Sequence, residues 1–159
     1  MKPINVGLLG IGTVGSGTWD VLQRNASEIE RRAGRAIQIT MVADKDVRKA
    51  RAIARKQARV VAYGFSLVRD KSIDIVVELV GGYGVAKALV LEAIGNGKHV
   101  VTANKALLAT HGNEIFKAAQ KRGVMVAFEA SVAGGIPIIK ALREGLAANR
   151  IAWIAGIIN

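Results

Sequence analysis

The chain has 159 residues, of which 51% are hydrophobic and 22% are charged, and its formal net charge is +11. This length and composition predict one domain with a buried core and exclude a disordered protein. The absence of cysteine excludes disulfides and thiolate metal sites. No apolar run reaches the roughly 18 residues that a membrane span needs. Because residues 1–3 lead directly into the first predicted strand, we expect no signal peptide. We therefore expect a cytoplasmic protein that does not contact membranes.

The first predicted element is a strand at residues 4–9, which leads directly into the sequence GIGTVG at residues 10–15. This GxGxxG pattern between a strand and a helix is typical of dinucleotide binding. Gly10 allows a tight turn, Gly12 lets a pyrophosphate approach the backbone, and Gly15 lets the helix pack close to the strand. The helix N-terminus, with Thr13 and Val14, then offers N–H groups to phosphates. The alternative is a glycine-rich turn without a ligand, which this context disfavours.

Apolar runs and helical stripes alternate along the rest of the chain. Further strands are predicted at residues 37–43, 60–63, 73–80, 98–102 and 124–128. Helices are predicted at residues 14–29, 47–58, 65–68, 83–94, 105–108 and 113–122, with Gly112 separating the last two. This order, with nearly continuous apolar strands, predicts an α/β fold of the Rossmann type: a doubly wound, mostly parallel sheet covered on both faces.

The pattern changes after residue 128. A loop rich in small residues precedes Pro137, a helix is predicted at residues 138–146, and a last apolar strand at residues 151–158. A strand without a following partner is typical of a chain that continues. We therefore expect a dinucleotide-binding domain at residues 1–136 and the beginning of a second, truncated domain at residues 137–159.

Polar residues at the carboxyl ends of the predicted strands are candidates for the site, because ligands of open α/β sheets bind there. The second strand ends at Asp44, which could bind the ribose 2′-hydroxyl of NAD. Lys45 and Arg48 follow and could instead bind the 2′-phosphate of NADP. The residues leave both cofactors open, with a slight preference for NADP.

Two further strand ends carry candidates. Gly81 and Gly82 could let the backbone approach the cofactor closely, or could form a plain turn. Lys105 could polarise a substrate oxygen or move a proton, or could be a surface lysine that begins a helix. Thr102 and Asn104 are alternative candidates for capping that helix.

The basic segment at residues 45–59 contains seven basic residues and one acidic residue. It could bind nucleic acid, form a solvated helix face, or create a field that favours an anionic cofactor. No aromatic residue interrupts the segment to provide a stacking platform. A solvated face with a cofactor contribution from its first residues is preferred, and no nucleic-acid partner is expected.

The remaining candidates for chemistry are interpreted as structural. His99 lies within an apolar run and is expected to be a core histidine, and His111 a cap or surface residue. Their spacing does not indicate a metal site. Trp19 and Trp153 are expected to pack in the core.

Four segments together resemble homoserine dehydrogenases. They are residues 7–15 (GLLGIGTVG), 77–82 (VELVGG), 97–108 (GKHVVTANKALL) and 128–139 (FEASVAGGIPII). The first is shared by many dehydrogenases, whereas the last two are specific to the family. The resemblance implies an NAD(P)-dependent oxidoreductase that interconverts L-homoserine and L-aspartate 4-semialdehyde, on the route to threonine, methionine and isoleucine. Another NAD(P)-dependent amino-acid dehydrogenase, or a non-catalytic dinucleotide-binding module, remains an alternative.

The resemblance also implies roles for single residues. Gly12, Thr13 and Val14 would line the pyrophosphate, and Lys105 would face the nicotinamide and substrate. A sodium ion would be held in the loop after residue 128, by the side chain of Glu129 and the backbone of Val132, Gly134 and Ile136. That loop could also be a glycine hinge, and Glu129 could contact substrate. Family members continue into a substrate and dimerisation domain, which implies a homo-oligomer and active-site residues outside this chain.

Overall fold

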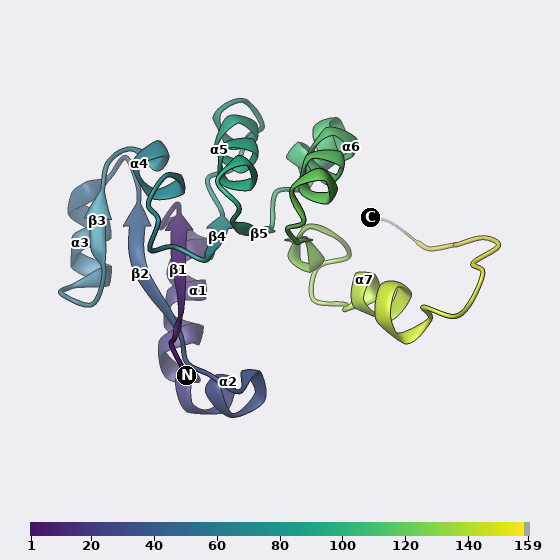
Figure 1. Cartoon of the computed structure of the whole chain (residues 1–159), viewed down its shortest axis with the longest axis horizontal. Coiled ribbons are helices and arrows are strands. Elements are labelled where there is room, and N and C mark those ends of the chain that lie inside the picture. Colours follow the sequence, from purple (N-terminus) through teal and green to yellow (C-terminus); the bar gives the residue numbers. More distant parts are fainter. Residues whose placement is uncertain (158–159) are drawn as a thin grey trace.

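The computed structural model describes residues 1–157 and contains one six-stranded sheet in the order β3-β2-β1-β4-β5-β6, with every neighbouring pair parallel. The strands are β1 (Ile4–Leu9), β2 (Ile37–Ala43), β3 (Arg59–Val61), β4 (Ile75–Glu78), β5 (His99–Thr102) and β6 (Val126–Ala127). The chain moves outward from β1 to β3, then returns to the other side of β1. The predicted doubly wound parallel sheet is confirmed (Figure 1).

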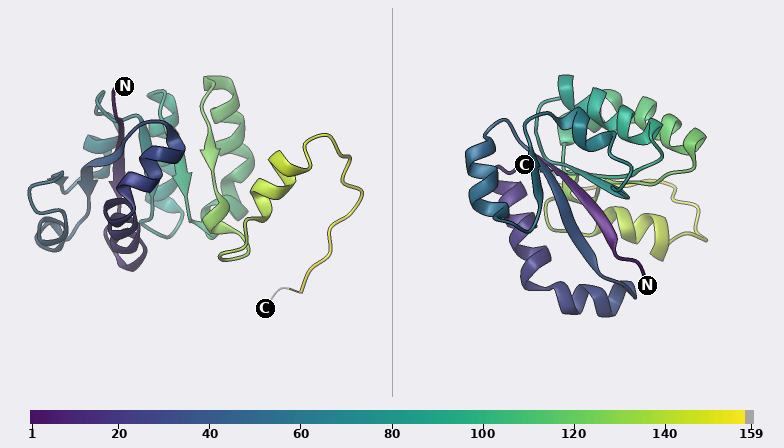
Figure 2. Two further views of the ribbon diagram at one scale, coloured as in Figure 1. Left: turned by 90° about the horizontal axis from the view of Figure 1, so that it is seen from below. Right: turned by 60° about the vertical axis from the view of Figure 1, so that its left-hand side comes forward.

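Helices cover both faces of the sheet (Figure 2). They are α1 (Thr13–Arg24), α2 (Ala26–Ala33), α3 (Val47–Ala54), α4 (Gly64–Val68), α5 (Gly84–Gly95), α6 (Lys105–Arg122) and α7 (Ile138–Lys140), which continues as a π-helical turn at Ala141–Gly145. Helices α1 and α3 bury one face, where Trp19 contacts the sheet, as predicted for this tryptophan. Helices α4, α5 and α6 bury the other face around a larger apolar cluster that includes Leu107 and Ile115. Burial on both faces explains the nearly continuous apolar strands.

Several predicted helices have different bounds in the structure. The helix predicted at residues 14–29 is divided at Asn25, a residue type that favours helix ends. The helix predicted at residues 47–58 ends at Ala54, because Arg55 adopts a positive φ of 50°. The break predicted near Gly112 was wrong. Gly112 is buried inside the continuous helix α6, where an added Cβ would lie 3.4 Å from the Phe116 ring.

The predictions of a strand at residues 151–157 and of packed side chains for Trp153 and His99 were also wrong. Residues 151–157 form no strand, because no strand among the described residues pairs with them, and Trp153 is exposed rather than packed. Residue 158 of that predicted strand lies outside the described residues. His99 is exposed rather than buried, and its Nδ1 accepts a hydrogen bond of 3.0 Å from the Met125 N–H. His111 lies inside α6 and is partly exposed, so it is a surface residue, one of the two alternatives predicted for it, and not a cap.

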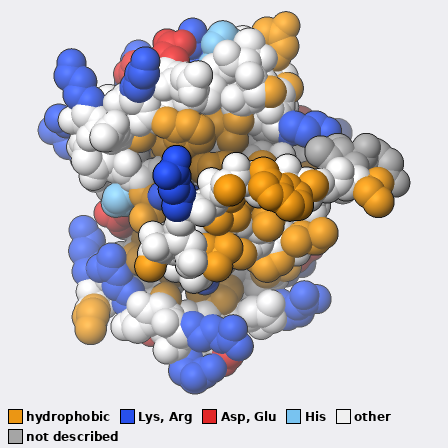
Figure 3. Space-filling model, turned by 90° about the vertical axis from the view of Figure 1, so that its right-hand side faces the viewer, with side chains coloured by type: hydrophobic (Ala, Val, Ile, Leu, Met, Phe, Trp, Pro, Cys, Tyr) orange, Lys and Arg blue, Asp and Glu red, His pale blue; other side chains and the backbone are white. Residues whose placement is uncertain are grey.

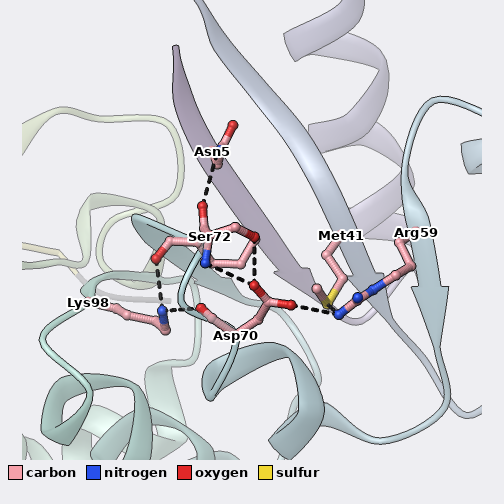
Figure 4. Close-up of polar contacts among 7 residues, drawn as sticks. Asn5, Met41, Arg59, Asp70, Ser72 and Lys98 are labelled. Atoms are coloured by element: carbon pink, nitrogen blue, oxygen red, sulfur yellow. Dashed lines mark hydrogen bonds and ion pairs between the residues drawn. The ribbon is translucent and has the colours of Figure 1, made fainter. Parts of the chain in front are cut away.

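The amino ends of the strands are held by a polar cluster (Figure 4). The Lys98 Nζ, which precedes β5, donates to the backbone carbonyls of Asp70 and Ile73, the latter at 2.8 Å. The Asp70 carboxylate accepts hydrogen bonds from the N–H and hydroxyl of Ser72 and from Arg59. These bonds fix the connection from α4 to β4. A cavity of about 440 Å³ lies beside this cluster, at the opposite end of the strands from the glycine turn.

Apolar side chains are exposed on the face that contains the C-terminal segment (Figure 3). The exposed large apolar side chains of residues 132–157 are Val132, Ile136, Leu146, Ile151, Trp153, Ile154 and Ile157. Large exposed apolar patches are typical of interaction surfaces.

Candidate functional site

The three glycines of the turn between β1 and α1 occupy three different environments. Gly10 has a φ of +91°, and an added Cβ would lie 2.8 Å from the Leu79 carbonyl oxygen. A Cβ on Gly15 would lie 2.1 Å from the Gly10 carbonyl oxygen, so a side chain there would separate the helix from the turn. A Cβ on Gly12 would meet no atom within 4 Å. Gly10 and Gly15 therefore serve the fold, whereas the space over Gly12 is free for a ligand.

The N-terminus of α1 adjoins this space. Gly12 is its N-cap, no side chain caps the helix, and the first turn contains no acidic residue. Backbone N–H groups at a helix start lack partners inside the helix and lie at the positive end of the helix dipole. Thr13 and Val14, both exposed, begin the helix. The turn can thus bind a phosphate through backbone groups.

Asp44 lies directly beside the glycine turn, at the carboxyl end of β2. Its Oδ2 accepts a hydrogen bond of 2.7 Å from the Ile11 N–H, and its Oδ1 accepts one of 2.8 Å from the Asp46 N–H. The half-buried carboxylate thereby joins the end of β2 to the glycine turn. Exposed Lys45 and Arg48 follow at the start of α3. Acidic and basic candidates for the 2′-position of a ribose therefore lie together at this corner.

The ends of β4 and β5 are joined by hydrogen bonds. Gly81 and Gly82 have φ values of +71° and +65°, which only glycine adopts readily. The Asn104 side-chain amide donates to the Gly82 carbonyl, and its oxygen accepts a hydrogen bond of 3.0 Å from the Leu107 N–H. Asn104 therefore caps α6, as one sequence alternative predicted. Thr102 does not cap the helix.

Glu78, which no sequence motif indicated as a site residue, is the central residue between these two strand ends. It is fully buried at the end of β4, directly opposite Thr102 of β5 in the sheet register. Its Oε2 accepts a hydrogen bond of 2.6 Å from the Thr102 hydroxyl, and its Oε1 accepts one of 3.0 Å from the Val80 N–H. The sequence does contain a sign of this role, because Glu78 is an acidic residue in a strand, β4, whose other residues are apolar.

Lys105 is the first residue of α6 and is exposed at the carboxyl end of β5. A cation at the N-terminus of a helix opposes the helix dipole and does not stabilise it. Lys105 follows the carboxyl end of β5, at the same edge of the sheet as the glycine turn. Helix stability therefore does not explain this lysine, which favours the functional interpretation.

The Glu129 carboxylate is bound by the backbone of α7. Its oxygens accept hydrogen bonds of 2.9 Å from the Ile139 N–H and 2.8 Å from the Lys140 N–H. The following loop is sharply bent, with φ values of 53° at Ala133 and 60° at Gly134. Val132, Gly134 and Ile136 offer the backbone atoms predicted for the cation site, and the Ile136 carbonyl already accepts from the Ile138 N–H at 2.8 Å.

Within residues 1–157, no group of three or more His, Cys, Asp or Glu side chains could hold a metal ion. No helix in this described part of the chain combines the length and apolar character that crossing a membrane requires.

A doubly wound parallel sheet with an open glycine turn after β1 and an acidic residue after β2 defines a Rossmann-type dinucleotide-binding domain. Residues 10–129 match the family model described as "Homoserine dehydrogenase, NAD binding domain". The chain belongs to this family.

Known relatives support the assignment along the whole chain. It is 63% identical over 159 residues to a homoserine dehydrogenase of Neisseria gonorrhoeae and 59% identical over 159 residues to one of Pseudomonas aeruginosa. Each alignment covers 100% of this chain and 36% of the relative. A crystal structure of a homoserine dehydrogenase from Thiobacillus denitrificans is 63% identical, with a TM-score of 0.88 over 94% of this chain and 35% of that one. The chain thus spans about a third of the length of these relatives.

Proposed function

We propose that this chain binds NAD(P) and is the cofactor-binding part of an enzyme that interconverts L-homoserine and L-aspartate 4-semialdehyde. The reaction would serve the synthesis of threonine, methionine and isoleucine. The observation that carries the proposal is the open space over Gly12 at the uncapped start of α1. The family match and the neighbouring strand ends support it.

We infer the cofactor contacts from this geometry. The backbone of Gly12, Thr13 and Val14 would hold the pyrophosphate at the N-terminus of α1. Either Asp44 would accept from the ribose 2′-hydroxyl, or Lys45 and Arg48 would bind a 2′-phosphate. Gly81 and Gly82 would contact the cofactor from the end of β4.

The bound nicotinamide would supply or accept the hydride. In the direction of reduction, a hydride adds to the aldehyde carbon of L-aspartate 4-semialdehyde, and its oxygen gains negative charge and then a proton. The Lys105 ammonium would stabilise this charge or deliver the proton. Residues beyond the matched third of the relatives would complete the substrate site.

A sodium ion at the loop after β6 remains part of the proposal. Carbonyl and carboxylate oxygens are suitable ligands for a hard monovalent cation, and Glu129, Val132, Gly134 and Ile136 would provide them. The donors fit in chemistry, although the Glu129 carboxylate already accepts two backbone hydrogen bonds. The cation would therefore share this carboxylate with the start of α7.

We also propose that residues 137–159 begin a second domain and that the complete protein forms a homo-oligomer. The exposed apolar side chains of this segment support the proposal, since burial would remove them from water.

Calorimetric titration of the chain with NADPH and, separately, NADH tests the proposed function. We expect binding of at least one cofactor. Tighter NADPH binding assigns Lys45 and Arg48 to the 2′-phosphate, whereas tighter NADH binding assigns Asp44 to the ribose. Binding of neither contradicts the proposal.

The substitution Gly12→Ala sharpens this test. Because its Cβ would meet no protein atom, we expect a folded variant whose free energy of unfolding changes by less than about 1 kcal/mol. The methyl group would occupy the space needed by the pyrophosphate, and we expect at least about tenfold weaker cofactor binding. Unchanged affinity would contradict the placement of the pyrophosphate.

A further inference from the structure

A buried carboxyl group lies under the cofactor edge of the sheet and has no role in the proposed chemistry. Glu78 is 0% exposed, and none of the ion pairs among the described residues involves it. Burying a carboxyl group without a cation is costly unless hydrogen bonds satisfy it. The hydrogen-bond partners of Glu78 therefore indicate the role of this buried carboxyl group.

The Glu78 carboxylate accepts hydrogen bonds at the ends of both β4 and β5. On β4, its Oε1 accepts from the Val80 N–H, directly before Gly81 and Gly82. On β5, its Oε2 accepts from the Thr102 hydroxyl, whose oxygen in turn accepts a hydrogen bond of 3.0 Å from the Asn104 N–H.

Asn104 closes the network. Its side-chain amide donates to the Gly82 carbonyl, and its side-chain oxygen caps α6, which begins at Lys105. One continuous set of hydrogen bonds thus fixes the glycine pair and Lys105 relative to each other. We name the side chains of Glu78, Thr102 and Asn104 the strand-end network.

The sheet itself does not require this network. The registered pairs on the amino side of Glu78 and Thr102 join Val77 to Val101 and Val76 to Val100, and these apolar pairs hold β4 against β5 without polar side chains. Buried polar networks that are fully satisfied rigidify a structure and specify one arrangement. Here, the groups that become rigid are the two loops that contain Gly82 and Lys105.

We propose that Glu78 and Thr102 are positioning residues, which act through Asn104 to hold Gly82 and Lys105 in the geometry that binds the nicotinamide ring. This inference rests on the proposed NAD(P) binding. It assigns the network to one end of the cofactor, because none of the network's side-chain hydrogen bonds reaches the glycine turn or Asp44.

The test compares two ligands that differ only in this end. NADPH contains the nicotinamide ring, whereas 2′-phospho-ADP-ribose lacks it but retains the groups proposed to bind at Gly12. If the chain prefers the unphosphorylated cofactor, NADH and ADP-ribose replace this pair. The ratio of the two dissociation constants, together with the fluorescence of the bound reduced nicotinamide, reports on the ring alone.

Thr102→Val removes the hydroxyl while keeping the side-chain shape. We expect NADPH binding to weaken about fivefold, 2′-phospho-ADP-ribose binding to stay within about twofold, and the fluorescence of bound NADPH to change. Thr102→Ser, which keeps the hydroxyl, should restore the wild-type ratio. Glu78→Gln, a second variant of the same shape, should change the ratio in the same direction as Thr102→Val.

Thr40→Val is the matched control. Thr40 lies on β2, and its buried hydroxyl makes no hydrogen bond among the described residues. The same chemical change should leave the ratio of dissociation constants at the wild-type value.

The outcomes separate the two proposals. If the wild-type chain binds neither ligand, the proposed function fails and this inference fails with it. If the wild-type chain binds both ligands but Thr102→Val leaves the ratio unchanged, only the positioning role is overturned. Equal weakening of both ligands, together with a lower melting temperature, would show a general structural role and would also overturn it.

Discussion

Lys98 and Lys105 lie at opposite ends of the same strand, β5, and their surroundings differ. Lys98 precedes the strand, is 4% exposed, and donates to two backbone carbonyls of the loop before β4. Lys105 follows the strand and is exposed. One ammonium group is used by the fold, whereas the other remains available to a ligand.

The same difference holds for the two ends of the sheet. At the amino ends, Asp70 is bound by Ser72 and Arg59. At the carboxyl ends, the start of α1 has no side-chain cap and the space over Gly12 is open. Parallel strands place all their carboxyl ends at one edge, so binding groups from distant parts of the sequence gather there. We expect substitutions at the two ends to separate stability from function.

The largest expected effect concerns Lys105→Ala. We expect the rate of hydride transfer to fall on the order of 100-fold or more, because the charge on the substrate oxygen would lose its stabilising ammonium. Stability should be unchanged, since Lys105 is exposed and opposes the helix dipole. The measurement is the steady-state rate of a chimera that joins this chain to the remaining part of the Neisseria gonorrhoeae relative.

Lys121→Ala provides the control for this prediction. Lys121 is an exposed lysine in the last turn of the same helix, far along α6 from the site. It should retain the wild-type rate. Equal rates for Lys105→Ala and Lys121→Ala would contradict the functional role of Lys105.

The opposite result is expected for Lys98→Met. The variant keeps an apolar side chain but loses the ammonium that binds the Ile73 carbonyl. We expect the free energy of unfolding to fall by about 2 to 3 kcal/mol, the usual effect of removing a charged hydrogen-bond donor. Cofactor affinity should stay at the wild-type value. Urea unfolding and cofactor titration measure the two quantities.

Lys71→Met is the matched control, because Lys71 is an exposed lysine in the loop before β4, the loop whose carbonyls accept from Lys98. It should leave both quantities nearly unchanged. If Lys98→Met loses cofactor affinity under conditions in which the variant is fully folded, the amino end of the sheet also affects binding. That result would contradict the separation of stability from function between the two ends.

The comparison also explains how much of the site could be predicted from the sequence. The glycine turn depends on residues adjacent in the sequence, so the roles of Gly10 and Gly15 in the fold follow from local rules and agree with the structure. The predicted strands agree with the structure for β1 and β2, which are apolar and buried against helices on both faces. The shorter strands β3 to β6 were predicted between one and four residues too long.

What could not be predicted depends on long-range register. The partner of Glu78 is set by the pairing of β4 with β5, which places it opposite Thr102, 24 positions away. Likewise, the apolar residues 151–157 have the composition of a strand, but no strand among the described residues pairs with them. The local sequence pattern predicts which secondary structure a segment can adopt. Whether it adopts a strand depends on the strands available to pair with it.

The smallest of these effects, and the one that depends on pH, is expected for Asp70→Asn. Hydrogen bonds from the side chain and backbone of Ser72, with a further contribution from Arg59, hold the pKa of Asp70 below its ordinary value. The ionised group therefore stabilises the folded state above the ordinary carboxyl pKa, and this contribution is lost as the pH falls through the lowered folded-state value. Arg59 is largely exposed and contributes little. Most of the effect therefore belongs to Ser72.

At about pH 7, we expect Asp70→Asn to lower the free energy of unfolding by about 1 to 2 kcal/mol, with cofactor affinity unchanged. The difference from the wild type should narrow as the pH is lowered toward about 3, because the wild-type carboxylate then takes up a proton. Urea unfolding across this range measures the difference, with Asp20→Asn on the exposed face of α1 as the control. A difference that stays constant with pH would mean that Asp70 acts through its shape rather than its charge, and that its ionised carboxylate does not stabilise the connection from α4 to β4.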